Sequence, residues 1–353
     1  MPEYLLLLAP SSNRVYAGDA PRIAAAEVEV LAAPDPATRF LGAGAVNIAG
    51  VPYLSVTTDG PLDPALLGRL SGAYACFVRG GAGEDDLLRP VTLERPERYD
   101  DDLLTIPKYP GKTNEQLTRT LLNLTLATTA WSKEAGTRRF SILDPLAGRG
   151  TTLSSALLLG HDAVGVEVER REVDAYATFL RTWLRRKRLK HTIDLRPLRR
   201  RGVHLGEVME VEVAPDKEAH RSGGRQSLTL YACDTLRTAE LVERRRFDAI
   251  VTDAPYGIAH GSRSAGGRNR SPAELLGAAV PIWASVLRTG GALGIAWNTH
   301  GLARDELAQM CSTAGLQVCS AGPYLRLAHR VDAGIHRDLL IARKLGPGAN
   351  AGA

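Results

Sequence analysis

From residue 103 onward, short apolar runs typical of strands alternate with segments whose apolar residues recur at helical spacing. Strands separated by helices pair in parallel, and the helices then cover both faces of the sheet. The alternation therefore predicts an α/β fold, a doubly wound Rossmann-like sheet, over residues 101–345. The predicted strands are residues 140–143, 163–168, 228–232, 249–252, 293–297 and 339–343, and helices are predicted from Thr113, over 151–159 and over 172–188.

The first hundred residues show a different order of elements. Their apolar pattern predicts strand, helix, strand, strand, helix and strand. This order is typical of a small ferredoxin-like α+β unit. A stretch rich in glycine, proline and acidic residues, 80–102, is typical of a linker. We therefore predict a ferredoxin-like domain over residues 1–100, a doubly wound domain over 101–345 and a flexible tail over 346–353.

Composition excludes several classes of protein. The chain has 353 residues, 44% of them hydrophobic, which is enough to bury a full core. Its four cysteines form no CxxC pair and no zinc-like spacing with histidine, so we expect neither disulfides nor a metal site. The apolar run at residues 4–9 is too short for a signal peptide or a membrane span. We expect a soluble, cytoplasmic protein.

Charge is unevenly distributed along the chain. Residues 1–100 carry a net charge of −5, and the remaining residues carry +10. Residues 181–201 hold ten basic side chains and one acid, a density typical of a nucleic-acid-binding surface and also of a solvated helix face. The glycine- and serine-rich segment 260–272 is either a mobile lid or a surface loop. The candidate nucleic-acid contacts are Arg185, Arg186, Arg188, Arg199, Arg200, Arg263 and Arg268.

The segment Asp-Pro-Leu-Ala-Gly-Arg-Gly-Thr, residues 144–151, lies between a predicted strand and a predicted helix. Gly148 and Gly150 allow a sharp turn and close approach to a ligand, and free N–H groups at the helix start favour an anionic group. Many such turns only close a corner between strand and helix. The dinucleotide fingerprint requires a third glycine where Leu153 stands, so a nucleotide-like ligand other than NAD is indicated.

Two carboxylates follow neighbouring predicted strands. Glu167 is placed to accept hydrogen bonds from both hydroxyl groups of a ribose, and Asp234 could accept one from the amine of an adenine. Either could equally be an ordinary carboxylate at a strand end or turn. Asn298 and His300 follow a strand at the same predicted edge, and they either line a base pocket or only form a turn.

The segment Asp253-Ala254-Pro255-Tyr256-Gly257 follows an apolar strand directly. An exocyclic amine of guanine or adenine is a poor nucleophile, because its lone pair is delocalised into the ring. The Asp253 carboxylate and the Ala254 carbonyl can each accept one N–H and hold the nitrogen in line with an electrophilic methyl group. Tyr256 can stack on an extruded base, and Pro255 restricts the turn. The alternative is a proline-containing turn without a catalytic role.

In this order and spacing, these segments resemble the S-adenosylmethionine-dependent amino-methyltransferases, whose signature is (D/N)PPY. Residues 251–257 and the segment Lys-Tyr-Pro-Gly-Lys-Thr-Asn-Glu at 108–115 further resemble the tRNA guanine-N2 methyltransferases that act at the tenth nucleotide. The resemblance covers residues 103–345 and implies a Rossmann-like methyltransferase domain. It also implies S-adenosylmethionine as the cofactor, with residues 108–113 closed over it.

The resemblance assigns roles to individual residues. It places the methionine part of the cofactor at the turn of residues 144–150, the ribose at Glu167 and the adenine at Asp234. The cofactor-binding residues that it implies are Lys112, Thr113, Asp144, Ala147, Gly148, Gly150, Thr151, Glu167, Val168, Asp234 and Thr235. The catalytic residues that it implies are Asp253, Ala254, Pro255 and Tyr256.

Two features depart from the family pattern. Ala254 replaces the first proline of the signature, which keeps the backbone carbonyl but leaves the loop less restricted. In the family a tRNA-binding THUMP domain usually follows the ferredoxin-like unit. The first hundred residues have room for the ferredoxin-like unit only. The basic segment 181–201 would then supply the phosphate contacts, in binding that weakens steeply as salt rises.

The implied function is methyl transfer to the exocyclic amine of a nucleic-acid base, with guanine N2 in tRNA as the first expectation. A DNA adenine-N6 or cytosine-N4 methyltransferase is the alternative with the same chemistry. A catalytically silent nucleic-acid-binding module that retains the fold is the alternative from another class. The sequence leaves open whether an accessory protein subunit takes part.

Overall fold

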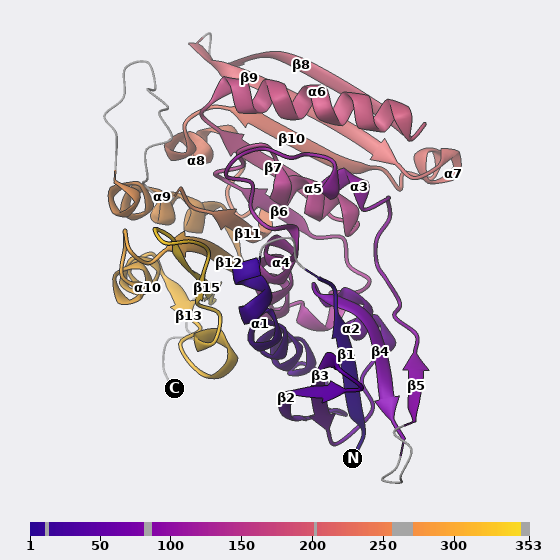
Figure 1. Ribbon diagram of the computed structural model, residues 1–353. Helices are drawn as coiled ribbons and strands as arrows, with labels where there is room; N and C mark the ends of the chain where they lie inside the picture. Colours follow the sequence, from indigo (N-terminus) through magenta and orange to yellow (C-terminus); the bar gives the residue numbers. More distant parts are fainter. Residues whose placement is uncertain (11–13, 81–86, 201–202, 256–270, 347–353) are drawn as a thin grey trace.

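The computed structural model describes residues 1–10, 14–80, 87–200, 203–255 and 271–346, which form two β-sheets with helices packed against them (Figure 1). The smaller sheet is built by the N-terminal residues and the larger one by the rest of the chain. No helix in these stretches is long and apolar enough to cross a membrane.

The N-terminal unit has the predicted order of elements. These are β1 (Glu3–Leu8), α1 (Arg14–Ala32), β2 (Phe40–Ile48), β3 (Val51–Thr58), α2 (Pro64–Arg69) and β4 (Ala73–Arg79). The strands lie in the order β2-β3-β1-β4-β5 with antiparallel neighbours, as in a ferredoxin-like unit. β5 (Leu88–Val91) corrects the prediction that residues 80–102 are only a linker. It is an edge strand, where Pro90, which has no N–H to donate, is tolerated.

The larger sheet has a doubly wound core, as predicted. Five parallel strands lie in the order β10-β7-β6-β11-β12. They are β6 (Ser141–Asp144), β7 (Asp162–Glu167), β10 (Gln226–Ala232), β11 (Phe247–Asp253) and β12 (Leu287–Asn298). From β6 the chain continues to β7 on one side, and it later crosses to β11 on the other. The topological switch point of this Rossmann-like sheet therefore lies between β6 and β11.

Both flanks of this core are antiparallel, so the prediction of a parallel sheet holds only for the central strands. β15 (His336–Lys344) pairs antiparallel with β12, and β13 (Leu316–Val318) and β14 (His329–Arg330) pair with β15. On the other flank, β8 (Lys190–Arg200) and β9 (Val203–Ala214) form a hairpin that pairs with β10. The stretch 215–226, between β9 and β10, contains α7 (Lys217–Arg221) and the first residue of β10.

Helices cover both faces of the larger sheet. The core on one face includes α4 (Glu115–Thr128), α5 (Thr151–Leu158) and α6 (Arg170–Arg186), with α3 (Asp102–Thr105) beside α5. The core on the other face includes α9 (Pro272–Val286) and α10 (Arg304–Thr313), with α8 (Thr238–Leu241) beside α9. Single 3-10 turns are η1 (Ser132–Glu134), η2 (Thr235–Arg237) and η3 (Gly322–Leu325).

α4 starts later than the predicted start at Thr113. The N-cap is Asn114, whose side chain accepts a hydrogen bond of 2.8 Å from the backbone N–H of Gln116. An asparagine caps a helix as well as a threonine does. Thr113 is thereby left outside the helix, in the segment that faces the end of β11.

α1 joins the two parts of the molecule. Ala24 and Val28 pack on the N-terminal sheet, whereas Ile23 and Val30 belong to the core that contains α4. Between the two helices, the fully buried Glu27 accepts hydrogen bonds from Asn123 Nδ2 at 2.7 Å and from Ser71 Oγ at 2.6 Å. A buried carboxylate that is satisfied across an interface fixes the way in which the two surfaces meet.

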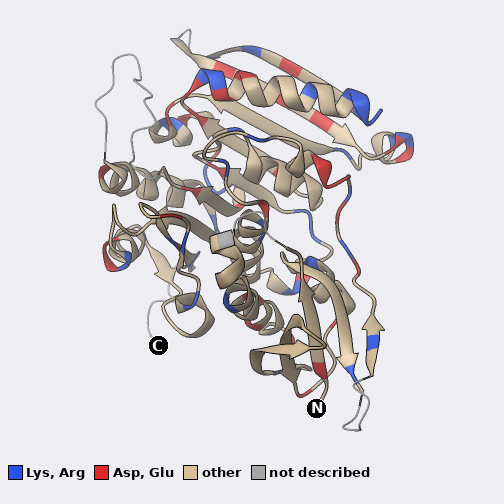
Figure 2. Ribbon diagram, in the orientation of Figure 1, with Lys and Arg blue, Asp and Glu red and all other residues tan. Residues whose placement is uncertain are grey.

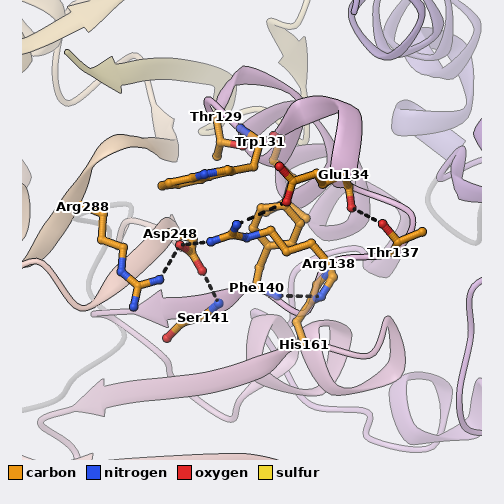
Figure 3. Close-up of polar contacts among 11 residues, drawn as sticks. Thr129, Trp131, Glu134, Thr137, Arg138, Phe140, Ser141, His161, Asp248 and Arg288 are labelled. Carbon is orange, nitrogen blue, oxygen red and sulfur yellow. Dashed lines mark hydrogen bonds and ion pairs between the residues drawn. The ribbon is translucent and has the colours of Figure 1, made fainter. Parts of the chain in front are cut away.

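A second buried carboxylate secures the amino-terminal edge of the larger sheet (Figure 3). Asp248, at the start of β11, accepts from Arg288 at 2.7 Å, from Arg138 at 3.2 Å and from the backbone N–H of Ser141 at 2.9 Å. The Arg138 guanidinium lies 4.4 Å from the centre of the Trp131 ring, close enough for a cation–π interaction. These contacts join β6, β11 and β12 at the edge opposite the predicted site.

Candidate active site

The strand order places three of the predicted carboxylates at one edge of the larger sheet. Asp144 ends β6, Glu167 ends β7 and Asp253 ends β11. Because β6 pairs directly with β11 and with β7, Asp144 and Asp253 lie on the two sides of the switch point. In open α/β sheets, ligands bind outside the carboxyl ends of the strands at this point.

Asp144 is buried and ties the glycine turn to β11. Its Oδ1 accepts from the backbone N–H of Leu146 at 3.1 Å and from the hydroxyl of Thr252 at 2.8 Å. Burial raises the pKa of Asp144 to about 6, these hydrogen bonds lower it, and the nearby Asp253 carboxylate raises it further. The turn and the strand that carries Asp253 are thus held in one arrangement.

The two glycines of the turn differ in their surroundings. Both have the left-handed backbone that favours glycine, with φ of +50° at Gly148 and +73° at Gly150. A Cβ atom at Gly150 would lie 2.6 Å from the Tyr176 ring, whereas one at Gly148 would meet no described atom within 4 Å. Gly150 is therefore required for packing, and Gly148 presents its backbone to open space where a ligand can approach.

Glu167 is anchored beside that open space. Its Oε2 accepts from the backbone N–H of Gly148 at 2.7 Å, and its Oε1 accepts from that of Glu169 at 2.8 Å. Burial raises the pKa of Glu167, and these two hydrogen bonds lower it. A carboxylate offers about four acceptor positions, so each oxygen can accept a further hydrogen bond from a ribose hydroxyl.

The remaining predicted cofactor contacts lie at the same edge of the sheet but differ in exposure and in hydrogen-bond partners. Val168 is exposed, and Ala147 is buried with its N–H bonded to the carbonyl of Val166. Asp234 caps η2 by accepting from the N–H of Leu236 at 2.9 Å. The hydroxyl of the buried Thr235 accepts from the indole N–H of Trp283 at 3.0 Å, so this side chain points toward α9.

The segment before α4 lies against the glycine turn. The Tyr109 hydroxyl is 3.1 Å from that of Thr151, the first residue of α5, and the Arg149 guanidinium lies 4.7 Å from the centre of the Tyr109 ring. Lys112 donates to the carbonyl of Leu104 at 2.5 Å and pairs with Glu115, which fixes the segment at its base. Tyr109 is absent from the predicted cofactor contacts although it lies within the segment expected to close over the cofactor.

Asp253 is held by groups from two other elements. Its Oδ2 accepts from the Thr113 hydroxyl at 2.5 Å and lies 3.5 Å from Nη2 of Arg337 on β15. The Asp253 side chain is 20% exposed and that of Arg337 only 6%. Burial raises the pKa of Asp253, while Arg337, Thr113 and then His329 lower it.

Sequence reasoning missed Arg337 and His329. Arg337 pairs with His329 across the short β14–β15 ladder, which brings both side chains to the end of the sheet where Asp253 lies. His329 is buried, its ring lies 5.6 Å from that of Tyr16 on α1, and burial lowers its pKa. The sequence signal for Arg337 was an arginine at the start of an apolar strand. Many strands with exposed ends also start with an arginine, so this signal does not single out a site residue.

The residues after Asp253 are described only in part. Ala254 is buried and donates its N–H to the carbonyl of Ala296 at 2.8 Å, so the turn starts against β12. Pro255 is exposed. Tyr256 lies outside the described residues, and so do residues 260–270 of the segment 260–272 that was predicted as a lid or a surface loop, with Arg263 and Arg268.

Asn298 ends β12 and secures the neighbouring turn. Its side-chain carbonyl accepts from the N–H groups of His300 and His336, at 3.2 Å and 3.1 Å. Its amide donates to the carbonyl of Gly334. These contacts support the turn-forming interpretation of Asn298.

The described candidates for nucleic-acid contact lie at the end of α6, just after it and on β8. Arg185, Arg186 and Arg188 are exposed at and just after the end of α6, whereas Arg199 is exposed on β8. The side chain of Arg200 lies outside the described residues. Figure 2 shows both acidic and basic residues on α6 and β8, and acidic residues on β9. Arg196 pairs with Glu210 of β9 at 2.9 Å, so acids that follow in the sequence offset part of the basic run.

No protein-family model and no curated protein matches the sequence. The fold is similar to that of TrmN from Thermus thermophilus, with 12% identity, 98% of this chain and 100% of that chain covered, and a TM-score of 0.42. It is also similar to the T. thermophilus 16S rRNA N2 G1207 methyltransferase RsmC in complex with AdoMet and guanosine, with 18% identity, 86% and 58% covered, and a TM-score of 0.37.

A third similar structure is a putative RNA methyltransferase from Pyrococcus horikoshii, with 15% identity, 71% of this chain and 93% of that chain covered, and a TM-score of 0.39. All three TM-scores lie below 0.5. The assignment of the fold therefore rests on the strand order and the switch point described above.

Proposed function

We propose that this chain is an S-adenosylmethionine-dependent methyltransferase that acts on the exocyclic amine of a base in RNA, with guanine N2 in tRNA as the target. The observation that carries the proposal is the position of Asp253. A carboxylate held by Thr113 and Arg337 stands at the switch point, next to a glycine turn whose backbone faces open space. The motif resemblance at residues 108–115 and 251–257 supports the choice of target.

The residues at the edge fit this cofactor. Glu167 can accept both ribose hydroxyls while keeping its bonds to Gly148 and Glu169. The backbone at Gly148 and the start of α5 can receive the carboxylate end of the methionine part. When bound, the cofactor supplies an electrophilic methyl group: the amine lone pair forms the new N–C bond, and the electrons of the broken C–S bond remain on sulfur.

Asp253 contributes to this reaction by orienting the amine. In the proposed arrangement its carboxylate accepts one N–H and the Ala254 carbonyl accepts the other, so the nitrogen lone pair points at the methyl group. Such positioning supplies on the order of 7–11 kcal/mol of barrier reduction when it is complete. After the N–C bond forms, the methylated nitrogen is positively charged and must lose one proton, and Asp253 lies where it can accept that proton.

The basic side chains at the end of α6 and on β8 are the proposed contacts to the RNA backbone. Arg185, Arg186, Arg188 and Arg199 are exposed and can approach phosphates. Because Arg196 is already paired with Glu210, we expect a smaller salt dependence than ten basic residues would give.

The test is incubation of the purified chain with methyl-labelled S-adenosylmethionine and, separately, total tRNA and genomic DNA, followed by nucleoside mass spectrometry. The expected result is label in N2-methylguanosine from tRNA, absent for Asp253→Asn. Label confined to DNA contradicts the proposal and supports a DNA amino-methyltransferase. Nucleic-acid binding without transfer to either polymer contradicts it in favour of a silent binding module.

A further inference from the structure

Arg337 reaches Asp253 across an intervening strand. It pairs with Asn298 of β12, whereas Asp253 pairs with Ala296 of the same strand, so the guanidinium spans β12 to approach the carboxylate. The separation of 3.5 Å and the 6% exposure of Arg337 make this an ion pair that is largely shielded from water. Neither the motif nor the local sequence assigns a role to this arginine.

Two opposing effects act on the charge of Asp253. Burial favours the neutral acid, and a cation within about 4–6 Å favours the carboxylate. Among the described residues, Arg337 from β15, Thr113 from the segment before α4 and His329 from β14 favour the charged form, in decreasing order. Asp144 from β6 is the neighbouring acid, and the Asp253 carboxylate raises the pKa of Asp144. Arg337 is thus the principal group that compensates for the burial of Asp253.

We propose that Arg337 is a positioning residue, whose buried guanidinium keeps the Asp253 side chain ionised and in the orientation in which it can accept the amine N–H. The role of Asp253 in this inference rests on the proposed function. The effect of Arg337 on the charge of Asp253 does not depend on that function and can be measured without substrate or cofactor. A protonated Asp253 would present an O–H donor to an amine whose N–H groups need acceptors. Without Arg337, the carboxylate is charged only at higher pH.

β15 offers a matched control. Arg304 donates to Asp338 Oδ2 at 2.5 Å, and the two side chains are 21% and 8% exposed. In this second shielded arginine–aspartate pair, Asp338 is the residue next to Arg337 on β15, and Arg304 is the first residue of α10. Arg304→Gln therefore reproduces the loss of an ion pair from β15 and leaves the environment of Asp253 in place.

The direct experiment is a carbon-13 NMR titration of aspartate carboxyl groups in the full chain without cofactor, with Asp253→Asn identifying the Asp253 resonance. We expect Arg337→Gln to raise the pKa of Asp253 by about 1–3 units, the range for removing an adjacent opposite charge. Arg337→Lys and Arg304→Gln should leave it within a few tenths of the wild-type value. Arg337→Met serves as the second neutral variant if the glutamine variant does not fold.

An unchanged titration of Asp253 in the neutral variants overturns the inference. So does an equal upward shift in Arg304→Gln, because loosening of β15 would then be the cause. In the same neutral variants, the acid limb of the pH profile of kcat/KM should move to higher pH. If the wild-type chain transfers no methyl group at all, the proposed function fails, while the titration still decides whether Arg337 sets the charge of Asp253.

Discussion

The two ends of β11 carry the same side chain in two different settings. Asp248, at the amino end, is bonded to two arginines and a backbone N–H, all from the neighbouring strands or the segments next to them. Asp253, at the carboxyl end, accepts from the Thr113 hydroxyl in the segment before α4 and lies near Arg337, which is two strands away. The first is built into the sheet edge, and the second faces the switch point.

This comparison shows how one strand serves stability at one end and chemistry at the other. The contacts of Asp248 tie strands together at the amino edge of the sheet, whereas Asp253 lies at the carboxyl edge, where open α/β sheets bind their ligands. The amino edge of a doubly wound sheet is also remote from the switch point. The contrast predicts that the same substitution at the two positions has opposite consequences.

The largest expected effect is loss of stability in Asp248→Asn. Removing one partner of a buried ion pair costs about 3–5 kcal/mol, and we expect the lower end because Arg138 and Arg288 are 27% and 43% exposed. Urea unfolding measures the change in the free energy of unfolding. A loss below about 1 kcal/mol would show that Asp248 does not hold the edge. Affinity for S-adenosylhomocysteine should remain at the wild-type value.

The same substitution at Asp253 should act on the reaction. Losing one preorganised charge contact in an active site costs about 10²–10³-fold in rate, so we expect a fall of this size in kcat for methyl transfer by Asp253→Asn. The free energy of unfolding should change less than in Asp248→Asn, because burial already disfavours the charge that the substitution of Asp253 removes. Unchanged transfer together with a large loss of stability would reverse the roles of the two carboxylates.

Glu167→Gln should weaken binding of the cofactor. Hydrogen bonds to a charged group contribute about 1.5–3 kcal/mol, so the dissociation constant for S-adenosylhomocysteine should rise about 10–100-fold by calorimetry. Glu169→Gln is the matched control, since that residue meets Glu167 through its backbone N–H. Equal affinities for the two variants would remove Glu167 from the cofactor site.

The smallest expected effect separates the two glycines of the turn. Both alanine variants incur about 1–2 kcal/mol of backbone strain, and Gly150→Ala adds a clash with the Tyr176 ring. Thermal unfolding should therefore show the greater loss for Gly150→Ala. Gly148→Ala should reduce cofactor affinity at a smaller loss of stability. The reverse order of stabilities would contradict the packing described for Tyr176.

Much of the fold could be predicted because its signals are local. The core strands are apolar runs bounded by glycine turns or strand-end acids, as at β6 and β11. β8 and β9 were missed because charged residues alternate with the apolar Ile193 and Leu195 in β8, so the run of charge hid the strand pattern. β15 was predicted as a strand, but its antiparallel direction depends on a connection that no local pattern specifies.

In the candidate site too, residues with a local sequence signal were predicted, and residues whose contacts depend on the tertiary fold were missed. Asp144, Glu167 and Asp253 were found because each follows a strand, and the carboxyl ends of parallel strands meet at one edge. Arg337 was missed because its contact with Asp253 depends on the antiparallel register of β15 with β12. Lys112 and Thr235 illustrate the converse, since their side chains form contacts within the protein that only the packing reveals.

A crystal structure of the full chain with S-adenosylhomocysteine tests the central claim most directly. We expect both ribose hydroxyls within hydrogen-bond distance of Glu167, the amino-acid part at the Gly148 turn and the sulfur on the side of the pocket that faces Asp253. A ligand bound away from the carboxyl ends of β6, β7 and β11, or a sulfur separated from Asp253 by protein atoms, would contradict the account.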